Sequence, residues 1–197
     1  MTRPTPARYK DPLEVIWTVA ASRLGLRIVR SDAVYAAWDG KGTLTLSTAE
    51  HFDPDDSLAQ LILHELCHAL VEGEAAFGLP DWGLDNMTSR DVVREYACQR
   101  LQCALATRHG LRDFFGSTTE YRSYWDTLPE DPLDDVSDPA TSPARAGFVL
   151  ACQAPYAEVL TAALEATRVI VAAVFPFAEP DSLYATSTVS LSATSTV

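Results

Sequence analysis

The first hydrophobic pattern along the chain is that of an amphipathic helix. Between positions 13 and 24, apolar residues recur at helical spacing and form one stripe. Asp11 stands where a helix cap is favoured, Pro12 suits the first helical position, and Gly25 suits a helix end. The sequence therefore predicts a helix that begins at Pro12 and is closed by Gly25.

The next three apolar segments are short and favour strands. Residues 26–29 are a short strand candidate, and residues 34–38 and 43–47 flank Asp-Gly-Lys-Gly at 39–42, which is typical of a hairpin turn. Threonine and leucine alternate in the second arm, so one face of that strand is expected to be buried and the other exposed. A small sheet near the N-terminus is the prediction.

The run from residue 57 to residue 72 predicts a helix of a different kind. Its apolar residues surround nearly the whole circumference, as expected for a buried helix. They are Leu58, Ala59, Ile62, Leu63, Leu66, Cys67, Ala69, Leu70 and Val71. The polar residues His64, Glu65, His68 and Glu72 share one narrow wedge, because a helix turns about 100° per residue. Buried histidines and carboxylates are costly unless something pairs with them.

A long second helix is predicted to begin at a capping box, Thr88-x-x-Asp91, and to end at Gly110. Its arginines lie on one side of the axis. They are Arg90, Arg94, Arg100 and Arg108. We expect this side to face solvent, which directs Glu95 inward, towards the preceding helix.

The pattern weakens after residue 110. Residues 114–128 are rich in aromatic residues and predict a helix, residues 130–143 predict an acidic loop with three prolines, and residues 155–174 predict a final helix. The Ser/Thr-rich octapeptide at 182–189 recurs at 190–197 with one difference. Such a segment has little to bury, so a flexible tail is expected.

Length and composition favour one globular domain. The chain has 197 residues, of which 47% are hydrophobic and 21% charged, enough for one sizeable core. The predicted fold class is α+β: a mostly helical, zincin-like domain with a small N-terminal β-sheet. We divide the chain into an arm (1–10), one domain (11–175, with a core at 11–110 and a helical part at 111–175), and a tail (176–197).

Charge and hydropathy exclude several classes of partner. The net charge of -12 argues against nucleic-acid binding, since no basic run can neutralise phosphates. The start of the chain does not resemble a signal peptide. The longest apolar stretch, 159–175, is interrupted by Glu165 and Arg168 and is expected to be too short to span a bilayer. The four cysteines have no CxxC spacing, so we expect free thiols and a cytoplasmic protein.

The polar wedge of the buried helix contains an HExxH motif, His64-Glu65-Leu66-Cys67-His68. Two imidazoles four residues apart can hold one zinc ion, and the glutamate beside the first can take a proton from water. A third ligand is needed. The metzincin extension is absent, because Val71 and Glu74 stand where it requires glycine and histidine. Glu95 is the better candidate and Glu72 the competitor.

At these residues the chain resembles the ImmA/IrrE family of zinc metallopeptidases. The likeness lies in HExxH within a leucine-rich helix, in Glu-Tyr-Ala-Cys-Gln-Arg-Leu at 95–101, in the long interval between the two, and in the alternating strand before the motif. It covers about residues 10–110. The chain departs from the family in showing no helix-turn-helix or sensor module, and residues from 111 onward have no counterpart.

The resemblance implies that His64, His68 and Glu95 bind Zn²⁺ and that Glu65 is the general base of peptide-bond hydrolysis. A protein or peptide substrate would be bound; the family's repressor-like substrates do not transfer to this chain. We further hypothesise that substrate adds as a strand beside residues 43–47, with Thr43 and Thr45 in contact. Two alternatives stay open: a zinc-binding but inactive sensor or interaction protein, and a metal-free helical protein with a coincidental motif.

Overall fold

The computed structural model describes residues 9–85, 89–116 and 121–186. The described chain is mostly helical, with a small three-stranded mixed sheet near its N-terminus, so the α+β class is confirmed. The longer elements are α1 (Pro12–Arg23), β1 (Arg27–Arg30), β2 (Ala36–Trp38), β3 (Thr43–Leu46), α2 (Leu58–Glu72), α3 (Ser89–Arg108), α4 (Arg122–Asp126), α5 (Thr141–Ala151) and α6 (Tyr156–Val174). The 3₁₀ turns are η1 (Ala49–His51), η2 (Glu74–Ala76), η3 (Pro80–Gly83), η4 (Phe175–Phe177) and η5 (Leu183–Ala185).

The first helix begins and ends where its sequence signals indicate. The Asp11 side chain accepts hydrogen bonds from the backbone N–H groups of Leu13 and Glu14, and Pro12 occupies the first turn. Gly25 follows the helix end with a φ of 87°, a left-handed conformation that glycine adopts without strain.

The sheet has the strand order β1-β3-β2, with β1 parallel and β2 antiparallel to β3. The predicted hairpin forms, and the Asp39 carboxylate accepts the N–H groups of Lys41 and Thr43 in its turn. Leu44 and Leu46 are buried, as the alternation predicts. However, β3 is the central strand and is paired on both sides, so the hypothesis that substrate adds beside it at Thr43 and Thr45 is wrong.

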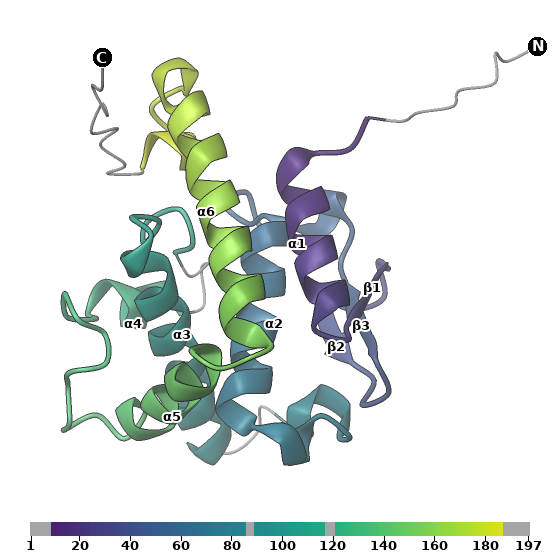
Figure 1. The fold of residues 1–197 in the computed structure, drawn as a ribbon, viewed down its shortest axis with the longest axis vertical. Coiled ribbons are helices and arrows are strands. Elements are labelled where there is room, and N and C mark those ends of the chain that lie inside the picture. The colour runs from purple at the N-terminus through teal and green to yellow at the C-terminus, as the bar shows by residue number, and fades with distance from the viewer. Residues whose placement is uncertain (1–8, 86–88, 117–120, 187–197) are drawn as a thin grey trace, which may run out of the picture.

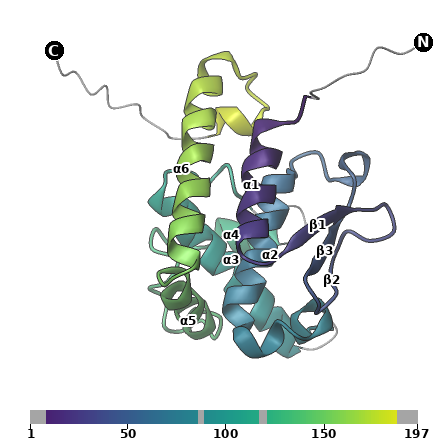
Figure 2. The same ribbon diagram turned by 45° about the vertical axis from the view of Figure 1, so that its right-hand side comes forward.

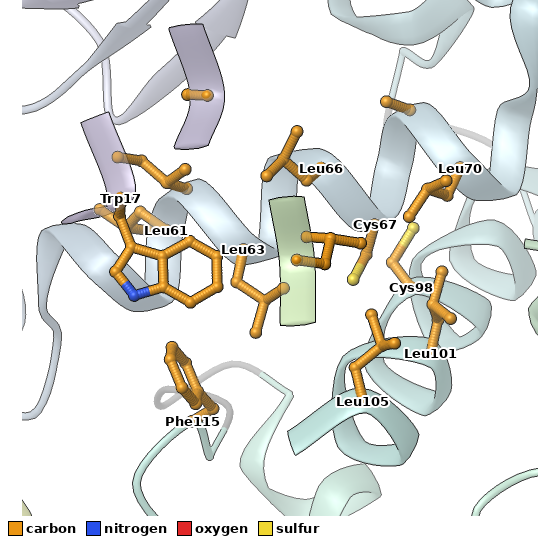
Figure 3. Packing of buried hydrophobic residues seen from close by; sticks show 14 of the residues in the cluster. Trp17, Leu61, Leu63, Leu66, Cys67, Leu70, Cys98, Leu101, Leu105 and Phe115 are labelled. Atoms are coloured by element: carbon orange, nitrogen blue, oxygen red, sulfur yellow. The ribbon is translucent and has the colours of Figure 1, made fainter. Parts of the chain in front are cut away.

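Helix α2 runs through the middle of the domain (Figures 1 and 2), packed against α1 on one side and against α3 and α5 on the other. The Ser57 side chain caps it by accepting the N–H of Gln60. The apolar surround is confirmed, because nearly every residue of α2 is buried. Figure 3 shows Leu63 and Leu66 of this helix in one cluster with Trp17 of α1 and Leu105 of α3.

Helix α3 turns Glu95 inward as predicted, but the premise of a solvent-facing arginine side holds only in part: Arg108 is exposed and Arg94 half-buried, whereas Arg100 is buried. Arg100 is only 2% exposed. It donates hydrogen bonds to the Tyr124 hydroxyl (2.6 Å) and the Asp138 carboxylate (2.8 Å), so the acidic loop before α5 covers this side of the helix. Thr88, the first residue of the predicted capping box, lies outside the described residues.

The C-terminal part differs most from expectation. Within the described residues of the predicted aromatic helix 114–128, only the short α4 is helical. The next helix, α5, begins inside the predicted loop and packs closely on α2 and α3. Gly147 permits this contact: a Cβ there would lie 3.3 Å from the Leu70 carbonyl and 2.9 Å from Leu101 Cδ2.

The last helix, α6, forms within the predicted range 155–174, but the apolar segment that contains it extends beyond the stretch 159–175. Together α6 and η4 span 22 residues (156–177), and an 18-residue stretch within them has a mean hydropathy of 1.6, so this segment is long and apolar enough to cross a membrane by length and composition alone. The expectation that it is too short is therefore wrong. A core helix meets the same criteria, and α6 packs on α1, where Trp17 Nε1 donates to Thr167 Oγ1 at 3.0 Å. Beyond it, the Tyr184 ring packs 5.4 Å from Phe114, inside the predicted tail.

Candidate metal centre

Three predicted ligands from two helices converge on one point. His64 Nε2 lies 3.0 Å from Glu95 Oε1, and His68 Nε2 lies 3.2 Å from Glu95 Oε2. The two Nε2 atoms are 3.0 Å apart. The two histidines come from successive turns of α2, and the carboxylate comes from the facing side of α3. Two imidazoles and a carboxylate are thus brought together in a largely buried place.

This group fits a small divalent cation. Zinc takes nitrogen and oxygen ligands at about 2.0–2.2 Å, which puts ligand atoms in a tetrahedral shell about 3.3 Å apart. Two of the observed separations, from His64 Nε2 to His68 Nε2 and from His64 Nε2 to Glu95 Oε1, are both 3.0 Å and so within a few tenths of an ångström of that spacing; His68 Nε2 contacts the other Glu95 oxygen at 3.2 Å. Three protein ligands would leave a fourth position open, the arrangement of catalytic zinc sites.

Without a metal, a proton on His64 balances the negative charge of Glu95. Burial alone lowers the pKa of His64, but the charge and hydrogen bond of Glu95, with smaller contributions from Glu65 and Gln102, raise it to about 9. Burial raises the pKa of the Glu95 carboxyl, but the charges and hydrogen bonds of the two histidines outweigh it and hold that pKa well below the usual value. The metal-free site therefore contains a carboxylate and an imidazolium at neutral pH.

Two residues that the sequence analysis did not select contact the other ring nitrogens. His64 Nδ1 lies 3.1 Å from Gln102 Oε1, and His68 Nδ1 lies 3.1 Å from Cys98 Sγ. Burial raises the pKa of the Cys98 thiol well above its usual value, so the thiol is neutral. The sequence alone led us to expect of Cys98 only that it is a free thiol. The signal was present, because Cys98 and Gln102 follow Glu95 by three and seven residues and so share its face.

Glu65 lies beside the triad and is held by Trp82, whose Nε1 donates to Glu65 Oε2 at 2.9 Å. The Trp82 ring is buried and stacks on Trp38 of β2, with ring centroids 4.6 Å apart. Asp81 and Trp82 both have positive φ, 46° and 57°, which is unusual for residues other than glycine. Asp81 is fixed by accepting the Trp38 backbone N–H. This strained turn aims the indole at Glu65.

Glu72, the competing third ligand, takes another partner. Its carboxylate forms an ion pair with Arg94 of α3, 3.1 Å from Nε to Oε1. Among the described residues, the group that could hold a metal contains Glu95 and not Glu72.

A cavity of about 520 Å³ opens onto the triad and Glu65. This is within the usual size range of small-molecule and peptide subsites. One wall of the cavity is the edge strand β2, at Ala36 and Ala37. Thr43 and Thr45 are not among the residues that line the cavity. The described lining residues include the acidic side chains Asp56, Glu65, Asp81, Asp85 and Glu95 and no lysine or arginine. Burial raises the pKa of Asp56 to about 6.

No protein-family model matches the chain, and no curated protein or solved structure matches it significantly.

Proposed function

We propose that this protein is a zinc-dependent metallopeptidase of the ImmA/IrrE type that acts in the cytoplasm. The observation that carries the proposal is the convergence of His64, His68 and Glu95 within hydrogen-bonding distance of one another, with Glu65 beside them on one cavity. The free state of all four cysteines agrees with a reducing compartment.

His64, His68 and Glu95 would hold the ion. A zinc ion in such a site acidifies water and polarises a carbonyl group. Glu65 takes the proton of the attacking water and passes it to the departing amine. Trp82 keeps one Glu65 oxygen bonded and thereby orients the carboxylate for this transfer.

The edge strand β2 is the better docking site for an extended peptide, in place of β3. The backbone groups of Tyr35 and Asp39 form hydrogen bonds with the β3 side of the hairpin. Because hydrogen-bonded and non-hydrogen-bonded positions alternate in an antiparallel pair, the backbone N–H and C=O groups of Ala36 and Trp38 point away from β3. The Trp38 N–H is already bonded to Asp81. Ala36 is then the residue of β2 whose backbone is directed at a substrate strand.

The decisive experiment pairs zinc content with peptide cleavage. The purified wild type should contain about one equivalent of zinc and should cleave a denatured protein or a peptide mixture. The cleavage products are detected by mass spectrometry. Glu65→Gln should keep the zinc and lose at least about a hundredfold in rate, as expected for removal of a general base. Glu130→Gln makes the same chemical change on an exposed loop side chain and should alter neither. Less than half an equivalent of zinc in the wild type contradicts the proposal.

One observation favours the alternative of a zinc-binding protein without peptidase activity. The Glu65 side chain is buried and already accepts a hydrogen bond, which are also the properties of a structural carboxylate. Stoichiometric zinc with no cleavage by the wild type, under conditions where the protein stays folded, selects this alternative.

A further inference from the structure

We propose that helix α3 positions both histidine ligands through their Nδ1 atoms: Gln102 orients His64 and Cys98 orients His68. The proposal rests on the metal centre of the proposed function, but it does not depend on peptide hydrolysis. Neither residue is a ligand, and neither touches a reacting atom in this scheme. Both are positioning residues.

The two residues belong to the same helical face as the third ligand. Starting from Glu95, steps of three and seven residues at about 100° each place Cys98 and Gln102 within roughly 60° of it. All three side chains are buried between α3 and α2. One face of α3 therefore supplies a ligand to the metal and a contact to each of the two ligands on α2.

The Gln102 amide is fixed in one orientation. Its Nε2 donates to the Phe115 carbonyl at 2.8 Å, so the oxygen, and not the nitrogen, faces His64. A carbonyl oxygen only accepts hydrogen bonds, so the proton on this side of the ring must belong to His64 Nδ1. Neutral His64 then carries its lone pair on Nε2, the atom that faces Glu95 and His68. Gln102 thus selects the tautomer that can bind a metal at the triad.

The anchor of this amide is itself rigid. Phe115 is fully buried, and its ring packs edge-on against Trp17 at 5.4 Å. Figure 3 shows both rings at the α1 end of the core. Because Trp17 is in turn bonded to Thr167 of α6, the carbonyl that orients Gln102 is tied to the core of the domain.

Cys98 acts on His68 in a weaker way. Its sulfur is buried near Cys67, Leu70 and Leu101, as Figure 3 shows, and lies 3.1 Å from Nδ1. A thiol is both a weak donor and a weak acceptor, so it admits either tautomer of His68. When His68 Nε2 binds a metal, Nδ1–H donates to this sulfur. We therefore expect a smaller contribution from Cys98 than from Gln102.

The test compares zinc affinity across matched variants by competition with a chelator. Removing such outer contacts costs about 10–100-fold in metal affinity, so Gln102→Met should fall towards the upper end and Cys98→Ala near the lower end. Cys98→Ser keeps an acceptor and should bind zinc within about threefold of the wild type. Cys103→Ala is the matched control, because Cys103 is an equally buried thiol on α3 that lies away from the triad; its affinity should not change.

A spectroscopic readout separates positioning from packing. In ¹⁵N-labelled zinc-loaded wild type, NMR should show His64 protonated at Nδ1 and bound through Nε2, and this Nδ1 proton should exchange faster in Gln102→Met. Zinc bound through His64 Nδ1, or Gln102→Met and Cys98→Ala binding zinc as tightly as Cys103→Ala, overturns the proposal. A wild type that binds no zinc overturns it together with the metal centre. Zinc binding without cleavage removes the peptidase function alone.

Discussion

The metal-free protein should lose stability between pH 6.5 and pH 8.5, because of the proton on His64. Its pKa in the folded chain is about 9, against a usual value of 6.5. A pKa raised by folding contributes stability that is fully present below 6.5 and disappears as the pH rises through 9. Integrating this linkage for one group gives a loss of about 2 kcal/mol between pH 6.5 and pH 8.5, out of about 3 kcal/mol in total.

The assay is urea unfolding of the chelator-treated protein at pH 6.5, 7.5 and 8.5. Glu95→Gln removes the main cause of the raised pKa, so its stability should vary far less over this interval. Glu130→Gln, an exposed carboxylate, should retain the full wild-type slope. A metal-free wild type whose stability is flat or increases from pH 6.5 to 8.5 refutes the reasoning.

The affinity for zinc should depend on pH in the opposite direction. Binding must displace the proton that His64 carries below pH 9, so the apparent affinity should increase about tenfold per pH unit over the same interval. The stability added by a fixed zinc concentration should then grow with pH while the metal-free stability declines. The stability added by zinc and the stability of the metal-free protein should then change with pH by similar amounts and in opposite directions. Such agreement identifies the His64 proton as the cause of both changes.

Three further predictions concern single side chains. Glu95→Ala should abolish stoichiometric zinc binding, whereas Glu72→Ala, which removes the ion pair with Arg94 of α3, should leave zinc content near one equivalent in metal analysis. Trp82→Phe keeps an aromatic ring on Trp38 but removes the donor to Glu65, so kcat for peptide cleavage should fall about tenfold or more with unchanged zinc content. Gly147→Val should destabilise the protein by about 1–3 kcal/mol in thermal unfolding, because its side chain enters the contact between α5 and α2; full stability there would contradict the observed packing.

What could be predicted from the sequence is what depends on neighbours along the chain. The cap at Asp11, the hairpin turn at Asp39 and the apolar surround of α2 are set within a few residues, and all three occur as expected. The pairing of α2 with Glu95 was also expected, but partly for a wrong reason. Arg100 is buried by Asp138 and Tyr124, which are about 25–40 residues away along the chain, and helical periodicity contains no information on such partners.

The features that escaped prediction all need tertiary contacts. The central position of β3 follows from its parallel pairing with β1, which the hairpin signal does not specify. Helix α5 begins within a segment rich in proline and acidic residues, and it approaches α2 closely at Gly147. Cys98 and Gln102 look like ordinary core and helix-surface residues until α2 is placed beside them.

The buried charges argue against a coincidental HExxH motif. Replacing a buried ion cluster by well-packed apolar residues is often neutral or stabilising, so stability alone does not explain two imidazoles and a carboxylate in the core. The surrounding residues nevertheless hold these side chains in place: Gln102 and Cys98 contact the Nδ1 atoms of the two histidines, and Trp82 donates a hydrogen bond to Glu65. Without a metal, a proton on His64 balances the negative charge of Glu95, and a divalent cation held by the three side chains would supply that positive charge instead. These outer contacts support the proposed metal site, because neither a structural ion pair nor a chance pattern requires them.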